Sequence, residues 1–313
     1  MAVIEGTDVE DLWDPRTEHT TVVERRRQAV LQNLAKLMPR LQATQFSKGG
    51  GLWFPHADER EPVVGSTWHL RSPDIFVIRR DFRSEPCQRS VKQLLLEGKE
   101  KRSQDVTRAA KEKIPFRTGA FMLWSLMIEA FLQTASIEPG EPEFVLMQSD
   151  FNPPNIMTRE DDEIVGLIDW DCLRAVPRQI GWCSIPHWLQ HDWHDDWSWP
   201  MTRKEEKPNL QPSEYSRYRQ DYARYMYEAC DRKGDCKFTS KSHIYQALFD
   251  SLEIFKKVEY LVVNVLADIV PRNTRHLKRH VERIGREGWC SKEGEMKWYQ
   301  AQFLEYFKPE IGS

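Results

Sequence analysis

One stretch near the middle of this 313-residue chain constrains its fold more than any other part. It runs from Phe144 to Asp171 and reads FVLMQSDFNPPNIMTREDDEIVGLIDWD. The apolar run at 144–147 predicts a short buried strand, and two further apolar runs flank the polar TREDDE segment, as in a β-hairpin. We therefore expect a strand, a polar loop and a hairpin whose second strand, at 164–168, is followed by a carboxylate.

Three polar side chains in this stretch are candidates for chemistry. Asp150 follows the first strand, in a loop where a carboxylate can accept a proton or hold a hydroxyl in line. Asn155 comes after two prolines that stiffen the loop, and its amide oxygen is a suitable ligand for Mg²⁺. Asp169 directly follows the hairpin. Phosphoryl transfer from a nucleotide uses such a set, because one group orients the attacking hydroxyl while the others hold Mg²⁺.

A plain turn is the alternative interpretation of these residues. Asp, Asn and Pro are all common in turns, so the D-x-x-x-x-N spacing alone is a weak signal. Asp150, Asn152 and Asn155 would then only cap a turn. The complete order of strand, D-x-x-x-x-N loop, strand, polar turn and strand ending in Asp favours a functional site.

This stretch also resembles a known family. QSDFNPPNIM and VGLIDWD resemble the catalytic and metal-binding segments of the aminoglycoside phosphotransferase-like kinases, H-x-D-x-x-x-x-N followed by I-D-W-D/E, with the fungal-type branch nearest. The continuation RAVPRQIGWCSIPHWLQHDW fits the same family, as does a helix at 22–41 followed by QFSKGGGLWF. The resemblance covers most of the chain.

The resemblance implies the C-terminal lobe of a protein-kinase-like fold. Its activity would be ATP- and Mg²⁺-dependent phosphoryl transfer to the hydroxyl of a small molecule. Asp150 would be the catalytic base, or the group that orients the hydroxyl, and Asn155 and Asp169 would ligate Mg²⁺ and so hold the nucleotide. The residues expected on the substrate side are Asp171, His191 and Asp192.

The sequence departs from the family pattern in two places. Gln148 stands where the family has a histidine that braces the loop, so we expect a weakened brace and not its loss. MAVIEG resembles the hinge between the two lobes, which makes residues 1–15 hinge-like and assigns 16–313 to the C-terminal lobe. The glycine-rich loop and the lysine that grip the phosphates would then be missing, either truly or through a misread start. Gly49–Gly51 does not replace them, because it lacks a phosphate-loop frame and indicates a turn.

The remaining pattern is mainly helical. Apolar periodicity predicts helices at 22–41, 87–113, 117–135, 179–190, 212–232, 239–268, 273–286 and 292–307. One apolar stripe is expected in the core, made of Leu123, Leu126, Met127, Ala130 and Phe131. Short extended segments are expected at 52–54, directly after the turn at the three glycines, and at 75–78. The predicted fold class is thus mainly α with a small β-hairpin, an α+β fold.

Composition and charge exclude several functions. A net charge of -3 and a pI near 6.3 give no electrostatic footprint for nucleic acid. The longest apolar run, Tyr260 to Val270, is too short to span a bilayer, and no secretory signal precedes the first helix. The six cysteines lack C-x-x-C spacing and are expected as reduced thiols. We expect a cytoplasmic protein without a nucleic-acid or membrane partner.

Two other functions stay open from the sequence. The chain could be a non-catalytic, pseudokinase-type binding module or a truncated fragment, with an apolar face and a protein partner where the N-terminal lobe would dock. A metal-dependent hydrolase built on the His and Asp residues at 187–196 is a weaker alternative, because no H-E-x-x-H frame is present.

Overall fold

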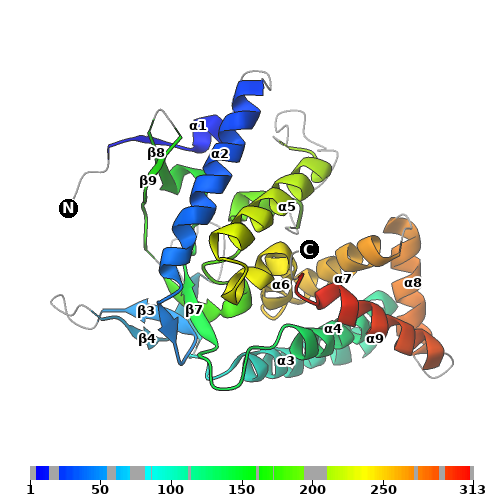
Figure 1. Cartoon of the computed structure of the whole chain (residues 1–313). Coiled ribbons are helices and arrows are strands. Elements are labelled where there is room, and N and C mark those ends of the chain that lie inside the picture. Colours follow the sequence, from blue (N-terminus) through cyan, green and yellow to red (C-terminus); the bar gives the residue numbers. More distant parts are fainter. Residues whose placement is uncertain are drawn as a thin grey trace.

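The computed structural model describes residues 5–13, 21–54, 61–70, 82–85, 87–111, 114–159, 162–171, 173–193, 210–270, 274–288 and 293–310. Its α-helices are α1 Glu10–Trp13, α2 Thr21–Leu37, α3 Val91–Lys111, α4 Pro115–Thr134, α5 Pro212–Ala229, α6 Ser242–Asp250, α7 Phe255–Ile269, α8 Thr274–Glu287 and α9 Glu293–Phe307. Its strands are β1 Thr7–Asp8, β2 Gln45–Phe46, β3 Gly50–Trp53, β4 Val63–Gly65, β5 Thr67–Leu70, β6 Phe82–Glu85, β7 Phe144–Met147, β8 Ile156–Thr158, β9 Ile164–Leu167 and β10 Arg174–Pro177. The predicted α+β class is confirmed (Figure 1).

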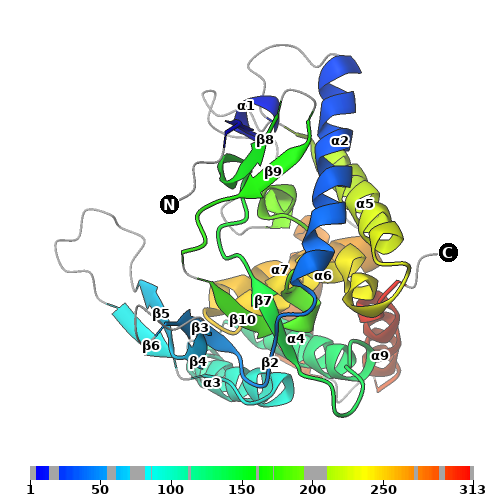
Figure 2. The same ribbon diagram turned by 60° about the vertical axis from the view of Figure 1, so that its left-hand side comes forward.

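A five-stranded antiparallel sheet lies at the centre, in the order β2-β7-β10-β3-β4 (Figure 2). The predicted strand at 144–147 is confirmed as β7, and β10 pairs with it along its whole length. The expectation of only a small hairpin was therefore wrong about the extent of β-structure. The sequence of β10, RAVP, shows no alternation of apolar and polar residues, and β10 is a strand because β7 and β3 hydrogen-bond to its two sides.

The predicted hairpin is confirmed in β8 and β9. Ile156 pairs with Leu167, and the register shifts between Met157 and Thr158, so the hairpin carries an irregularity beside the polar turn. Strand β1 pairs with the other side of β8 and completes a separate three-stranded sheet. Through β8, the hairpin thus joins the N-terminal strand β1 to the loop at 148–155, which directly precedes β8.

Most predicted helices are present, and the expected stripe on α4 is fully buried in the core. The prediction of a helix at 179–190 was wrong. That segment contains two single 3₁₀ turns, Arg178–Ile180 and His187–Leu189, since Pro186 just before the second turn cannot donate a helical hydrogen bond. The predicted helix at 239–268 is divided into a 3₁₀ segment, α6 and α7, with extended backbone at Ile254. The extended segment expected at 75–78 lies outside the described residues.

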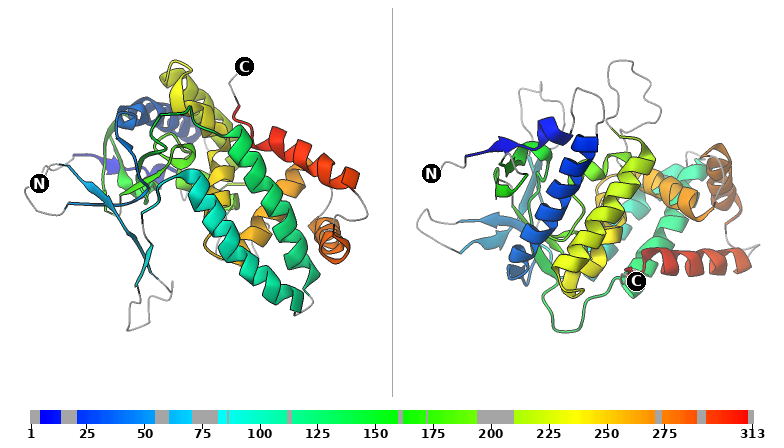
Figure 3. Two further views of the ribbon diagram at one scale, coloured as in Figure 1. Left: turned by 90° about the horizontal axis from the view of Figure 1, so that it is seen from below. Right: turned by 45° about the horizontal axis from the view of Figure 1, so that its top comes forward.

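Helices α4 and α8 approach each other very closely. Seen from below, α3 and α4 lie side by side with α9 and α8 next to α4 (Figure 3). A Cβ atom at Gly285 of α8 would lie 1.8 Å from the carbonyl oxygen of Pro115, and one at Gly119 of α4 would lie 2.0 Å from the carbonyl oxygen of Val281. Both contacts are with backbone, which cannot rotate away, so only glycine fits at this crossing.

No helix in the described part of the chain is long and apolar enough to cross a membrane.

Replacing Gly285 with alanine is expected to destabilise the protein by about 2–3 kcal/mol or more, because the added methyl group would push the two helices apart. The loss should appear as a lower midpoint in urea unfolding. Gly294→Ala is the matched control, because a Cβ atom at this position of α9 meets nothing within 4 Å. The control should keep or slightly raise the midpoint, and an unchanged midpoint for Gly285→Ala would contradict the close approach.

Candidate functional site

The loop at 148–155, which joins β7 to β8, contains two of the predicted site residues in direct contact. The Asn155 amide nitrogen Nδ2 donates to the Asp150 carboxylate oxygen Oδ2 at 3.0 Å and to the Asp150 backbone oxygen at 2.8 Å. Asn152 donates to the other carboxylate oxygen of Asp150. Asn155 is buried and Asp150 is exposed, so a fixed amide holds an accessible carboxylate. The Asn155 oxygen Oδ1 takes no part in these bonds and remains the atom available to a metal.

Gln148 braces this loop against the end of the hairpin. Its side chain is buried, and its Nε2 donates to the backbone oxygens of Ile168 at 2.6 Å and Asp169 at 3.2 Å. The backbone nitrogen of Ile168 in turn donates to the backbone oxygen of Asn155 at 3.0 Å. The glutamine therefore supplies two hydrogen bonds to the backbone that follows the hairpin, and they place Asp169 next to the loop.

Asp169 directly follows the hairpin in an uncommon backbone conformation. Its φ of 53° lies in the left-handed region, which a residue other than glycine adopts at a cost of about 1–2 kcal/mol. Gln148 holds its carbonyl, and the indole of the next residue, Trp170, donates to the Leu167 oxygen at 2.7 Å. The carboxylates of Asp169 and Asp171 belong to exposed residues. The turn is thus fixed by its neighbours while its acidic groups remain accessible.

The N-terminal segment packs on the outer side of the loop. The backbone nitrogen of Val9 lies 3.2 Å from the Pro153 oxygen and 3.1 Å from the Ile156 oxygen. Beneath the loop, Phe151 makes an edge contact with Trp188, whose ring also meets Trp13. These contacts hold the backbone of the 148–155 loop in place, and Asp150 is part of that loop.

The structure places Asp192 in a different environment from the 148–155 loop. Both carboxylate oxygens accept from Arg219 of α5, at 2.6 and 2.9 Å, and both side chains are largely buried. Asp192 lines a cavity of about 850 Å³ whose lining residues include none from the loop. His191 is exposed and its ring faces Tyr215. Hydrogen bonds thus connect Asp150, Asn155 and the backbone of Asp169, whereas Asp192 pairs with Arg219 and the His191 ring lies against Tyr215.

The donor set suits Mg²⁺ better than a transition metal. Within the described ranges, no three His, Cys, Asp or Glu side chains converge to hold a metal ion, and His194, Asp195 and Asp196 lie outside those ranges. This leaves the alternative of a metal-dependent hydrolase without support from the described residues. Carboxylates and an amide oxygen are hard ligands, and Mg²⁺ in nucleotide sites commonly takes only one or two protein carboxylates, with phosphates and water completing its shell.

The comparison with known proteins decides the family. The model of the phosphotransferase enzyme family matches residues 1–179. The chain belongs to this family. The match includes the 148–155 loop, the hairpin and β10, and phosphotransferase activity on small molecules is what the family suggests. No curated protein and no solved structure matched the chain.

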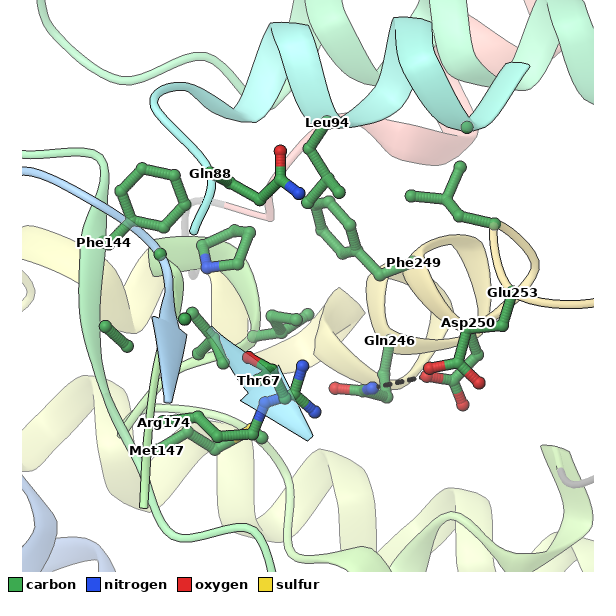
Figure 4. A pocket seen from close by; sticks show the side chains of 18 of the residues that line it. Thr67, Gln88, Leu94, Phe144, Met147, Arg174, Gln246, Phe249, Asp250 and Glu253 are labelled. Atoms are coloured by element: carbon green, nitrogen blue, oxygen red, sulfur yellow. Dashed lines mark hydrogen bonds between the residues drawn. The ribbon is translucent and has the colours of Figure 1, made fainter. Parts of the chain in front are cut away.

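A cavity beside β10 in this phosphotransferase-family protein was not predicted from the sequence. It has a volume of about 290 Å³ and lies between the central sheet, α3 and α6 (Figure 4). Met147 and Arg174, which pair across β7 and β10, both line it. Met147 immediately precedes Gln148, so the cavity begins at the base of the loop that carries Asp150. The only sequence signal was an arginine three residues after Asp171.

Proposed function

We propose that this protein takes part in phosphoryl transfer from Mg²⁺-ATP to the hydroxyl of a small molecule. The observation that carries the proposal is the connected unit of Asp150, Asn155, Gln148 and Asp169, which hydrogen bonds join across the loop and the hairpin. Phosphoryl transfer depends largely on positioning and charge neutralisation, which such a fixed set of oxygen ligands provides.

Each residue has a separate role in this proposal. Asp150 is exposed, so an acceptor hydroxyl can reach it, and Asn155 fixes the direction of its carboxylate. Asn155 Oδ1 and the Asp169 carboxylate would hold Mg²⁺. The bound metal would neutralise charge on the nucleotide phosphates. Gln148 acts indirectly, because it holds the backbone from which Asp169 projects.

The cavity at the base of the loop is the proposed acceptor site. It has an apolar wall with a few polar groups and lies at the lower end of the size range of small-molecule pockets. Met147 connects it to the loop within three residues of Asp150. A bound acceptor could therefore extend a hydroxyl toward the carboxylate while the cavity holds the rest of the molecule.

The proposed domain division assigns residues 1–15 to a hinge and 16–313 to a C-terminal lobe. Two features support it: β1 pairs with β8, and Val9 hydrogen-bonds to the 148–155 loop. A segment that contacts the catalytic loop in this way is suitably placed to connect it to a nucleotide-binding lobe. That lobe, or a partner that replaces it, would supply the glycine-rich loop and the lysine.

One observation favours the alternative of a non-catalytic binding module. Trp53, Phe54 and Val63 are 46%, 57% and 50% exposed at the edge of the central sheet, and Trp53 pairs with Val63. Neighbouring exposed apolar side chains of this size offer a surface for a protein partner. The two functions differ in one property, because only the first requires binding of a nucleotide together with a metal.

Calorimetric titration of ATP into the purified chain tests the proposal. Heat of binding is expected with excess Mg²⁺ and should disappear when a chelator removes the metal, because the carboxylates would then face the phosphates without neutralisation. Release of ADP in the presence of candidate acceptors measures turnover. Absence of binding under both conditions would favour the non-catalytic module.

A further inference from the structure

Arg174 lines the cavity at the base of the loop and has no ion-pair partner among the described residues. Its Nε atom is buried without a hydrogen-bond partner. Arg174 is half-buried, and a buried guanidinium nitrogen without a partner is costly, because it loses hydration that nothing replaces. A ligand that supplies the missing acceptor atoms would remove this cost.

The position of Arg174 is fixed by its strand. It pairs with Met147 on one side of β10 and with Gly51 on the other, so both neighbouring strands hold its backbone. Its side chain extends into the cavity near Thr67 and Gln246 (Figure 4). The guanidinium thus occupies a defined place between the base of the loop and the C-terminal end of α6.

The carboxylates of the same cavity already have partners. Asp250 accepts from Gln246 at 2.8 Å and lies 3.7 Å from the Lys257 ammonium, and Glu253 lies 3.4 Å from the same ammonium. None of them forms an ion pair with Arg174. The opposite wall is apolar and includes Leu94, Phe144 and Phe249 (Figure 4). Among the described residues, the cavity therefore offers the Arg174 guanidinium and an apolar surface to the same ligand.

We propose that Arg174 binds an anionic group, a carboxylate or a phosphate, on a small organic molecule whose apolar part packs against Leu94, Phe144 and Phe249. Guanidinium binds both anions through paired hydrogen bonds. If the proposed phosphoryl transfer holds, this molecule is the acceptor, and the acceptor class is a hydroxylated organic anion. This class is opposite in charge to a polycationic acceptor.

The test compares two probes that differ mainly in charge. 3-Phenylpropanoate carries a carboxylate on an apolar body, and 3-phenylpropanamide is its neutral counterpart. Titration without nucleotide should show the carboxylate binding about 10- to 100-fold more tightly than the amide, the range expected for a hydrogen bond to a charged group. Arg174→Gln should remove this preference. Equal binding of the two probes to the wild-type protein would overturn the proposal.

Three additions make the result decisive. Arg174→Lys keeps the charge but not the paired donors, so it should recover only part of the preference for the carboxylate probe. Its recovery would also show that a change at this position is tolerated.

Inorganic phosphate that displaces the carboxylate probe would indicate that a phosphate group is also accepted, while phosphate binding alone would identify phosphate as the anion. Failure of both anions to bind would overturn the proposal. Glu163→Gln, a change of an exposed carboxylate on the hairpin, should bind the probes normally. Because no nucleotide is present, the titration gives its result even if the chain transfers no phosphoryl group.

Discussion

Replacing Asp150 with alanine is expected to abolish measurable phosphoryl transfer while leaving Mg²⁺-ATP binding intact. Asp150 is the exposed carboxylate of the 148–155 loop, and removal of a positioned proton acceptor costs about 10²–10⁴ in rate. The fold should survive, because Asn155 keeps its hydrogen bond to the Asp150 backbone oxygen. ADP release under saturating ATP, measured with an acceptor that the wild-type protein uses, checks the prediction.

Two further variants separate charge from structure at this position. Asp150→Asn keeps the size of the side chain but loses the charge, and it should be nearly as inactive as the alanine variant. Glu163→Gln is the control, because Glu163 is an exposed carboxylate on the hairpin that pairs with Arg159. This control should retain full turnover. Wild-type rates in Asp150→Ala would exclude the proposed role of the carboxylate.

Asp169→Ala is expected to remove Mg²⁺-dependent binding of ATP. The carboxylate is the charged member of the proposed metal site, and Asn155 alone offers only a neutral oxygen. Calorimetry should therefore show the heat of the wild-type titration disappearing in the variant. Circular dichroism of the same sample would establish that the lost binding is not caused by unfolding.

The backbone conformation of Asp169 requires a matched control for this variant. Alanine tolerates a positive φ poorly, so part of any effect could come from backbone strain. Asp231 has a φ of 49°, close to the 53° of Asp169, and is also exposed, but it lies at the end of α5 away from the site. Asp231→Ala should therefore show the same strain with normal ATP binding. Equal loss of binding in both variants would contradict the role of Asp169 as a ligand.

The sequence predicted the parts of the fold that depend on local pattern. Strand β7 and the β8–β9 hairpin each have their own short apolar run bounded by polar residues, and the stripe on α4 recurs at helical spacing. The contact between Asp150 and Asn155 also follows from a short loop with two stiff prolines. These features form within a few neighbouring residues, so they are visible in the sequence.

The parts that were missed depend on distant partners. β10 is a strand because β7 and β3 provide hydrogen bonds, although its own sequence carries no strand pattern. The segment after it was predicted as a helix, yet its short turns are fixed by contacts such as that between Trp188 and Phe151. Arg174 could not be distinguished from other arginines, because its lack of a partner becomes visible only when the cavity around it is known.

The packing of α2 on α5 has a consequence for synthesis of the chain. Arg27 and Gln28 of α2 hydrogen-bond to Tyr218 and Asp221 of α5, which leaves the ribosome roughly 175 residues later. At typical elongation rates of about 5–20 residues per second, the apolar side of α2 stays uncovered by α5 for roughly 10–35 seconds after its synthesis. We therefore expect the nascent chain to depend on chaperones during this interval, and slower translation before α5 should lower the yield of folded protein.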